Sequence, residues 1–209
     1  MVKQDRARRT HELLLDSAAA EFVRHGYAGA NLHRVAQEVQ MTKGALYAHF
    51  ASKRLLAEAL TGPFEHTWRD VLRQAEQADA SPVEKLGLLA AGLAERLQSD
   101  PRFRAGFHLV SEDARAHGRL PRVAHDLCGS VVNLMAEARQ QDQPLATAEP
   151  ERLATLLLAL MFGVYYSTPE CRMDRFGELL CTTWCQALGA GQPALPAGRE
   201  RRPEPCRQA

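Results

Sequence analysis

The chain has 209 residues, of which 45% are hydrophobic and 24% are charged, and this composition suits a globular protein with a full core. No run of eighteen apolar residues is present, so we expect no transmembrane helix and no membrane partner. The N-terminal segment is basic and then amphipathic. It lacks the uninterrupted apolar region of a signal peptide, and we therefore expect a cytoplasmic protein.

The net charge of +1 conceals an uneven distribution. Residues 1–54 contain nine Lys/Arg and five Asp/Glu (+4), residues 55–190 contain thirteen and eighteen (−5), and the part from 191 contains four and two (+2). A basic segment is what phosphate neutralisation requires, although many protein surfaces are equally basic. The charge therefore indicates nucleic-acid binding only if a binding motif coincides with it.

The first predicted helix covers residues 6–25 and ends at Gly26, a residue typical of helix C-termini. Its apolar residues recur at helical spacing and form a core stripe: Leu14, Leu15, Ala18, Ala19, Phe22 and Val23. Three arginines at its start, Arg6, Arg8 and Arg9, either contact DNA or belong to a solvated terminus, and the sequence leaves both readings open.

Two short helices with a tight connection come next, which is the layout of a helix-turn-helix. The first covers residues 31–39, with Asn31 as its N-cap. The connection is Gln40-Met41-Thr42, and Thr42 caps a second helix over residues 43–50. In this layout the second helix enters the major groove of DNA.

The second helix combines small, cationic and aromatic residues around a thin apolar stripe. Gly44 and Ala45 allow a close approach of the backbone, Lys43 supplies a cation, and Tyr47 and His49 can hydrogen-bond phosphates. Each residue alone is typical of a solvated face. Their spacing behind a capped partner helix favours DNA contact.

The segment TKGALYAHFASKRLL resembles the recognition-helix signature of the TetR family of bacterial transcriptional regulators. The preceding GYAGANLHRVAQEVQM resembles that family's helix before the turn, so the resemblance covers about the first 60 residues. Together with RFRAGFHLVSEDARA, the recognition segment also resembles the γ-butyrolactone-receptor branch. The predicted DNA-contacting residues are Asn31, Thr42, Lys43, Gly44, Ala45, Tyr47, His49 and Lys53.

One position departs from the family pattern. Gln40 stands where the family usually has Gly in the turn, and a left-handed backbone there suits Gly. We therefore predict a positive φ for Gln40.

The remaining chain has only helical patterns. Ser52 caps a helix that continues to about residue 77, with a kink or break expected at Gly62-Pro63. Further helices are predicted over residues 82–98, 101–117, 122–140, 150–167 and 174–188. The protein is thus expected to be all-α, with a helix-turn-helix domain at 1–53, an effector-binding and dimerisation domain at 54–189, and a disordered tail at 190–209.

The last two helices are rich in apolar residues, the first of them almost all round. The resemblance implies that they pair with their symmetry mates in a homodimer, whereas the alternative is a pair of core helices in a monomer. The residues predicted for the dimer interface are Leu157, Met161, Leu180 and Trp184.

The resemblance also implies an apolar effector pocket, for which a filled core is the alternative. Its predicted lining is Trp68, Phe103, Phe107, Val131 and Met135. Butyrolactone receptors carry a ligand-covering Trp where Asp126 aligns, which argues against a lactone here and for another ligand, with a donor or a positive charge, or for none.

No catalytic, metal or cofactor site is predicted. The five cysteines suggest no disulfide framework, and Cys181 and Cys185 are read as buried apolar residues. The sequence thus predicts a DNA-binding regulator, most simply a repressor released from a palindromic operator by a small apolar effector. The rival hypotheses are a helical protein-interaction module and a helical enzyme with an accessory DNA-binding head.

Overall fold

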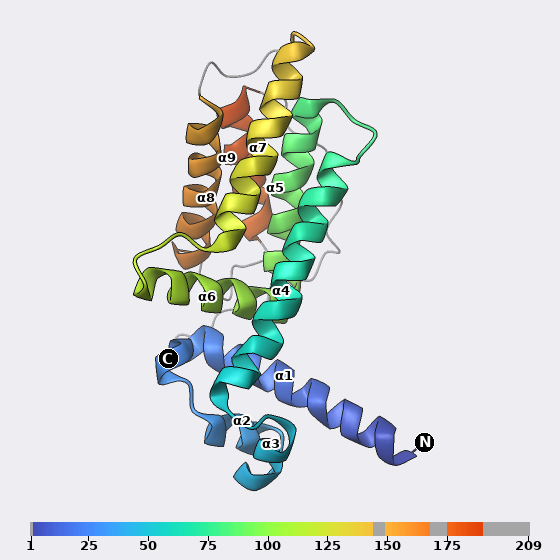
Figure 1. The fold of residues 1–209 in the computed structure, drawn as a ribbon, viewed down its shortest axis with the longest axis vertical. Helices are drawn as coiled ribbons and strands as arrows, with labels where there is room; N and C mark the ends of the chain where they lie inside the picture. Colours follow the sequence, from blue (N-terminus) through green and yellow to red (C-terminus); the bar gives the residue numbers. More distant parts are fainter. Residues whose placement is uncertain (1, 144–148, 168–174, 190–209) are drawn as a thin grey trace. The chain divides into compact units, whose positions relative to one another are not determined.

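The computed structural model describes residues 2–143, 149–167 and 175–189, and these form helices and connecting turns without a strand (Figure 1). This confirms the predicted all-α class. The helices are α1 (Val2–Gly29), α2 (Leu32–Glu38), α3 (Lys43–His49), α4 (Lys53–Glu76), α5 (Pro82–Ser99), α6 (Pro101–Ala116), α7 (Arg122–Gln140), α8 (Pro150–Ser167) and α9 (Phe176–Leu188). The predicted tail at 190–209 lies outside the described residues.

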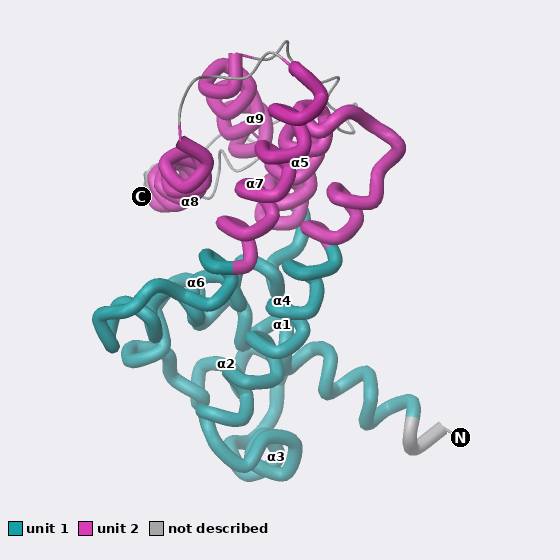
Figure 2. The backbone as a smooth tube through the Cα atoms, turned by 45° about the horizontal axis from the view of Figure 1, so that its top comes forward, with its two compact units in different colours: residues 1–70, 99–125 teal, residues 71–98, 126–209 magenta. Residues whose placement is uncertain are grey.

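The chain divides into two compact units (Figure 2). Unit 1 consists of residues 1–70 and 99–125, and unit 2 consists of residues 71–98 and 126–209. Unit 1 therefore contains α6 and most of α4 in addition to the helix-turn-helix. The domain boundary predicted at residue 53 was drawn between a DNA-binding part and an effector-binding part. It differs from the boundary between the two compact units.

Unit 1 has α1 at its centre, between α6 and the α2–α3 pair (Figure 1). Arg102 of α6 links this helix to α1. Its Nε donates to Asp16 Oδ1 at 2.6 Å, and its Nη1 and Nη2 donate to the carboxylate and the backbone carbonyl of Glu12 at 2.5 and 2.9 Å. The same guanidinium lowers the pKa of Glu12. Ala105 and Leu109 of α6 are part of the same hydrophobic core as the buried residues of α1, α2 and α3. We therefore count α6 with these helices as the head of the protein.

The far end of α1 is also held by α6. Gly26 has φ 66° and ψ 176°, a conformation that favours glycine, and it breaks the regular helix where the sequence predicted an end. The backbone N–H of Tyr27 donates to Glu112 at 2.7 Å. A Cβ on Gly26 would lie 3.0 Å from the Glu112 carboxylate, so a larger residue there would also make that side chain shift slightly.

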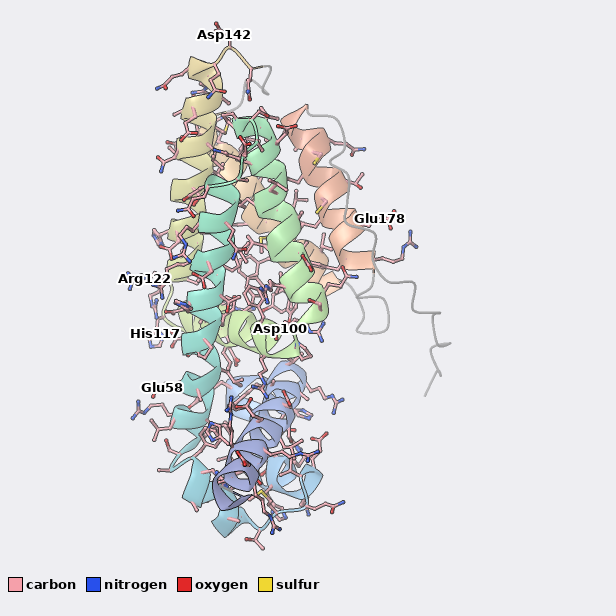
Figure 3. The ribbon with its side chains drawn as sticks, turned by 90° about the vertical axis from the view of Figure 1, so that its right-hand side faces the viewer. Glu58, Asp100, His117, Arg122, Asp142 and Glu178 are labelled. Carbon is pink, nitrogen blue, oxygen red and sulfur yellow. The ribbon has the colours of Figure 1, made fainter. Side chains whose placement is uncertain are left out.

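The start of α6 is set by its own N-cap. Asp100, labelled in Figure 3, lies between α5 and α6, and its carboxylate accepts from the backbone N–H groups of Arg102 and Phe103 at 3.0 Å. These donors have no partner within the helix, so the cap satisfies them.

Of the kink or break predicted at Gly62-Pro63, the break does not occur, because α4 continues through Pro63 from Lys53 to Glu76. Packing on either side of the proline explains this. Leu60 and Phe64 are both buried, and Phe64 lies so close to α6 that a Cβ on Gly106 would be 2.3 Å from the Phe64 Cβ. Burial of these side chains offsets the one backbone hydrogen bond that the exposed proline removes.

Unit 2 places α5, α7, α8 and α9 side by side (Figure 1). The last helix is anchored to α5, because the Trp184 indole donates to the Leu86 carbonyl at 3.0 Å. The four predicted dimer contacts, Leu157, Met161, Leu180 and Trp184, are each 0% exposed within one chain. Fully buried side chains fill this unit's own core and leave no surface for a partner, so the predicted dimer contact cannot rest on them.

No described helix is long and apolar enough to cross a membrane.

Candidate nucleic-acid interface

The α2–α3 pair is built from the two caps that the sequence predicted. Asn31 accepts from the N–H of His33 at 2.9 Å, and Thr42 accepts from the N–H of Ala45 at 3.2 Å. The buried sides of the two helices consist of Leu32, Val35, Ala36 and Leu46. The apolar stripe thus fixes which face of α3 remains outside.

The turn between the helices has the predicted geometry. Gln40 has φ 56°, which confirms the predicted positive φ. Its N–H donates to the Gln37 carbonyl at 3.0 Å, and the N–H of Met41 donates to the Ala36 carbonyl at 2.8 Å, so these two carbonyls in the last turn of α2 have partners. The left-handed residue therefore closes α2 and lets α3 begin three residues later.

Glu21 connects α1 to the start of α2. Its carboxylate is nearly buried and accepts from the Asn31 N–H at 2.7 Å and from Arg34 at 3.0 and 2.6 Å. Burial raises the pKa of Glu21, but the hydrogen bonds from Arg34 and Asn31 outweigh it and hold the pKa below its ordinary value. Glu21 was not among the residues predicted from the sequence. Its signal was an acidic side chain at helical spacing from Leu14 and Ala18, with an arginine on the next helix.

The exposed face of α3 carries most of the predicted DNA contacts. Thr42, Lys43 and Gly44 are exposed, and the Tyr47 side chain is 41% exposed. Lys43 Nζ lies 5.8 Å from the centre of the Tyr47 ring, so cation and aromatic group share one patch. A Cβ on Gly44 would meet no atom within 4 Å, which leaves the backbone there open to a ligand.

His49 is set apart from this face. It is half-buried, with its ring 6.2 Å from that of His11, which stacks on Phe50 at 4.6 Å. This histidine pair could not be predicted from the sequence, because its members lie 38 positions apart on different helices.

Lys53 makes internal contacts. Its Nζ donates to the carbonyls of Ala28 and Ala30 at 3.0 and 2.7 Å and lies 5.1 Å from the centre of the Tyr27 ring. These bonds hold the segment that precedes α2, and the phosphate contact of Lys53 stays a prediction.

Three of the predicted pocket residues gather in unit 1. Trp68 of α4 lies parallel to Phe103 and Phe107 of α6, with ring centres 6.3 and 6.2 Å apart, and Phe64 lies at 5.8 Å. We call these four residues the aromatic cluster. The other two, Val131 and Met135, are buried within unit 2.

The described part of the chain has no group of three or more His, Cys, Asp or Glu that could hold a metal ion. Cys181 and Cys185 are buried in α9. Burial, with a smaller contribution from Cys185, raises the pKa of Cys181 to about 11, so this thiol is protonated at neutral pH.

Residues 14–60 match the family model for bacterial regulatory proteins of the TetR family. A segment of 164 residues is 28% identical to the A-factor receptor protein of Streptomyces griseus, covering 78% of this chain and 56% of that protein. The match therefore spans little more than half the length of that relative. A segment of 156 residues is 28% identical to the regulator TtgR of Pseudomonas putida, covering 75% of this chain and 67% of TtgR.

Among solved structures, the fold is similar to CprB from Streptomyces coelicolor, determined in complex with its operator sequence. The TM-score is 0.73 at 26% sequence identity, covering 90% of this chain and 91% of CprB. Together with the two capped helices and the left-handed turn, these matches show that residues 14–60 form a helix-turn-helix domain of the kind found in bacterial regulatory proteins of the TetR family.

Proposed function

We propose that the protein is a sequence-specific DNA-binding transcriptional regulator, a repressor that a small apolar effector releases from its operator. The observation that carries the proposal is α3, which presents Lys43, Gly44 and Tyr47 on an open face behind a capped α2. TtgR is named a transcriptional regulator, and CprB is bound to an operator in its solved structure.

DNA binding is assigned to this face by the chemistry of its residues. Lys43 supplies the positive charge for a phosphate or for the acceptor edge of guanine, and Tyr47 supplies a hydroxyl donor. The open backbone at Gly44 permits a close approach to the duplex. Asn31 is the N-cap of α2 and Thr42 is the N-cap of α3, so the hydrogen bonds of these caps hold both side chains in place.

We propose a homodimer that reads a palindromic operator, with its two recognition helices about 34–36 Å apart. Exposed apolar side chains on α8 and α9 are the candidates for the dimer contact, because the buried ones serve the core: Leu156 (39% exposed), Tyr166 (49%) and Leu179 (53%). These residues replace Leu157, Met161, Leu180 and Trp184 in the proposed contact.

Effector release is proposed as a population shift: an effector that binds better to the DNA-free state draws the dimer away from the operator. The name of the A-factor receptor and the butyrolactone receptors among the similar folds make a γ-butyrolactone a reasonable first effector to test. The presence of Asp126 in place of the expected Trp still favours a different ligand.

The decisive experiment is the selection of bound sequences from random DNA by the full chain. A palindromic consensus, bound more weakly by a Lys43→Ala, Tyr47→Ala variant, is the expected result. Recovery of no consensus would reject the regulator and leave the interaction module or the enzyme. Titration of a medium-chain acyl-γ-butyrolactone into the protein–operator complex then tests the effector class: release at low micromolar lactone would show that the missing Trp is unimportant.

A further inference from the structure

We propose that the indole N–H of Trp68 is the hydrogen-bond donor for the effector, and that the effector is a flat, apolar, uncharged molecule with a neutral acceptor such as a ketone or ester carbonyl. This inference rests on the proposed effector-regulated function. It goes further because it assigns one atom of the protein and one functional group of the ligand.

The two tryptophans of the chain provide the first argument. Both Trp68 and Trp184 are 0% exposed. Trp184 donates its N–H to the Leu86 carbonyl at 3.0 Å, which is the usual state of a buried indole. Trp68 Nε1 finds no acceptor among the residues that the structure describes. A buried donor without a partner destabilises the fold, so its presence calls for an explanation.

The surroundings of Trp68 provide the second argument. Phe103 and Phe107 lie nearly parallel to the indole, at interplanar angles of 11° and 10°, and Phe64 is tilted against it. These side chains offer apolar contact and no hydrogen-bond acceptor. A phenylalanine at position 68 would offer the same kind of apolar contact, whereas a hydrogen bond to a ligand requires the indole N–H.

The chemical class of the effector follows from this combination. Aromatic rings on both helices favour a flat apolar group. The single N–H requires an acceptor on the ligand. An ionised group would lose its hydration on entry and gain only one donor in exchange, so the acceptor is neutral. A ligand with a positive charge, one of the options that the sequence left open, would place a second donor against this N–H.

The test uses two probes of the same shape, acetophenone and α-methylstyrene. They differ in a C=O group that becomes C=CH₂, so only acetophenone can accept the indole proton. The full chain labelled with ¹⁵N on its indoles gives one signal for each of its two tryptophans, and a Trp68→Phe variant assigns them.

We expect acetophenone to shift the Trp68 indole signal saturably, to leave the Trp184 signal in place, and to bind roughly tenfold more tightly than α-methylstyrene. In the Trp68→Phe variant the two probes should bind equally. If this variant does not fold, the comparison of the two probes on the unaltered protein decides the question alone.

Two outcomes would overturn the inference: no effect of acetophenone on the Trp68 signal at millimolar concentration, or equal affinities for the two probes. Binding of the selected operator is measured on the same preparation. If the protein binds the operator but acetophenone does not shift the Trp68 indole signal, only this inference is rejected. If the protein does not bind the operator, the result counts against the proposed function.

Discussion

Helix α3 and helix α9 were both predicted to make intermolecular contacts, but the predicted residues are exposed in α3 and buried in α9. The predicted residues Thr42, Lys43, Gly44 and Tyr47 lie on an open face. The predicted residues Leu180 and Trp184 of α9 are completely buried in their own unit. The difference arises because a polar and small-residue pattern marks a surface directly, whereas an apolar stripe identifies the face that packs first against its own chain.

The largest expected effect is a loss of stability when a buried residue of α9 is replaced. Trp184→Arg would place an unpaired cation among apolar residues and remove the bond to Leu86, at a cost of about 3–5 kcal/mol. We expect loss of cooperative thermal unfolding, measured by circular dichroism.

Leu179→Arg is the matched variant on the exposed side of the same helix. It should unfold at nearly the temperature of the unaltered protein and should sediment as a monomer. If Leu179→Arg remains a dimer, the dimer contact does not include Leu179. If Trp184→Arg folds normally, Trp184 is not buried in the core of its own unit.

The next effect concerns α3. Lys43→Ala should weaken operator binding by about 1–3 kcal/mol, and its combination with Tyr47→Ala should weaken it further. Affinity should fall steeply with salt concentration, with a smaller slope for Lys43→Ala because one phosphate or base contact is lost. Titration of labelled operator DNA at several salt concentrations measures both. Lys85→Ala, on α5 of unit 2, removes a cation outside the interface and should change nothing.

A smaller effect concerns the support of α2. Glu21→Gln keeps the shape of the side chain but removes the charge that accepts from Arg34 and Asn31, at an expected cost of about 1–3 kcal/mol. The pKa of Glu21 is lowered on folding, so its contribution is present above the unfolded pKa and disappears as the pH falls through the folded one. Denaturant melts between pH 7 and pH 3 should show the two proteins converging at the acidic end. A constant difference over this range would contradict the assignment.

The smallest effect concerns the turn. Gln40→Gly relieves the left-handed strain of about 1 kcal/mol but loosens the unfolded chain, so the free energy of unfolding should rise slightly or stay the same. Urea melts of the two proteins measure this. A loss of more than 1 kcal/mol would indicate that the Gln40 side chain makes a contact of its own.

Most of the fold could be predicted from local signals. The caps at Asn31, Thr42 and Asp100 and the periodic apolar stripes are short-range features, and the helix boundaries follow from them. The continuity of α4 through Pro63 has the opposite origin, because the helix is maintained there by the contact of Phe64 with Gly106, 42 positions away.

The site was predictable to a lesser degree. The exposed face of α3 follows from its composition, but the internal bonds of Lys53 depend on two carbonyls of a distant segment. Likewise, the aromatic cluster could be suspected from family layout, but the unpaired N–H of Trp68 is visible only once its neighbours are placed. Long-range pairing is what one sequence cannot show.

The attachment of α6 to α1 has a consequence for building hybrid regulators. Arg102 binds the middle of α1 at Glu12 and Asp16, Glu112 binds its C-terminal part at Tyr27, and Ala105 and Leu109 complete the core that α6 shares with α1. A DNA-binding module cut after residue 53 would carry a bare apolar face where α6 belongs, and it would be prone to aggregate. A transplant of residues 1–53 alone should fold only in a recipient whose α6 carries charges that match those of the donor's α1. In any other recipient, two separate stretches of the gene have to be moved together.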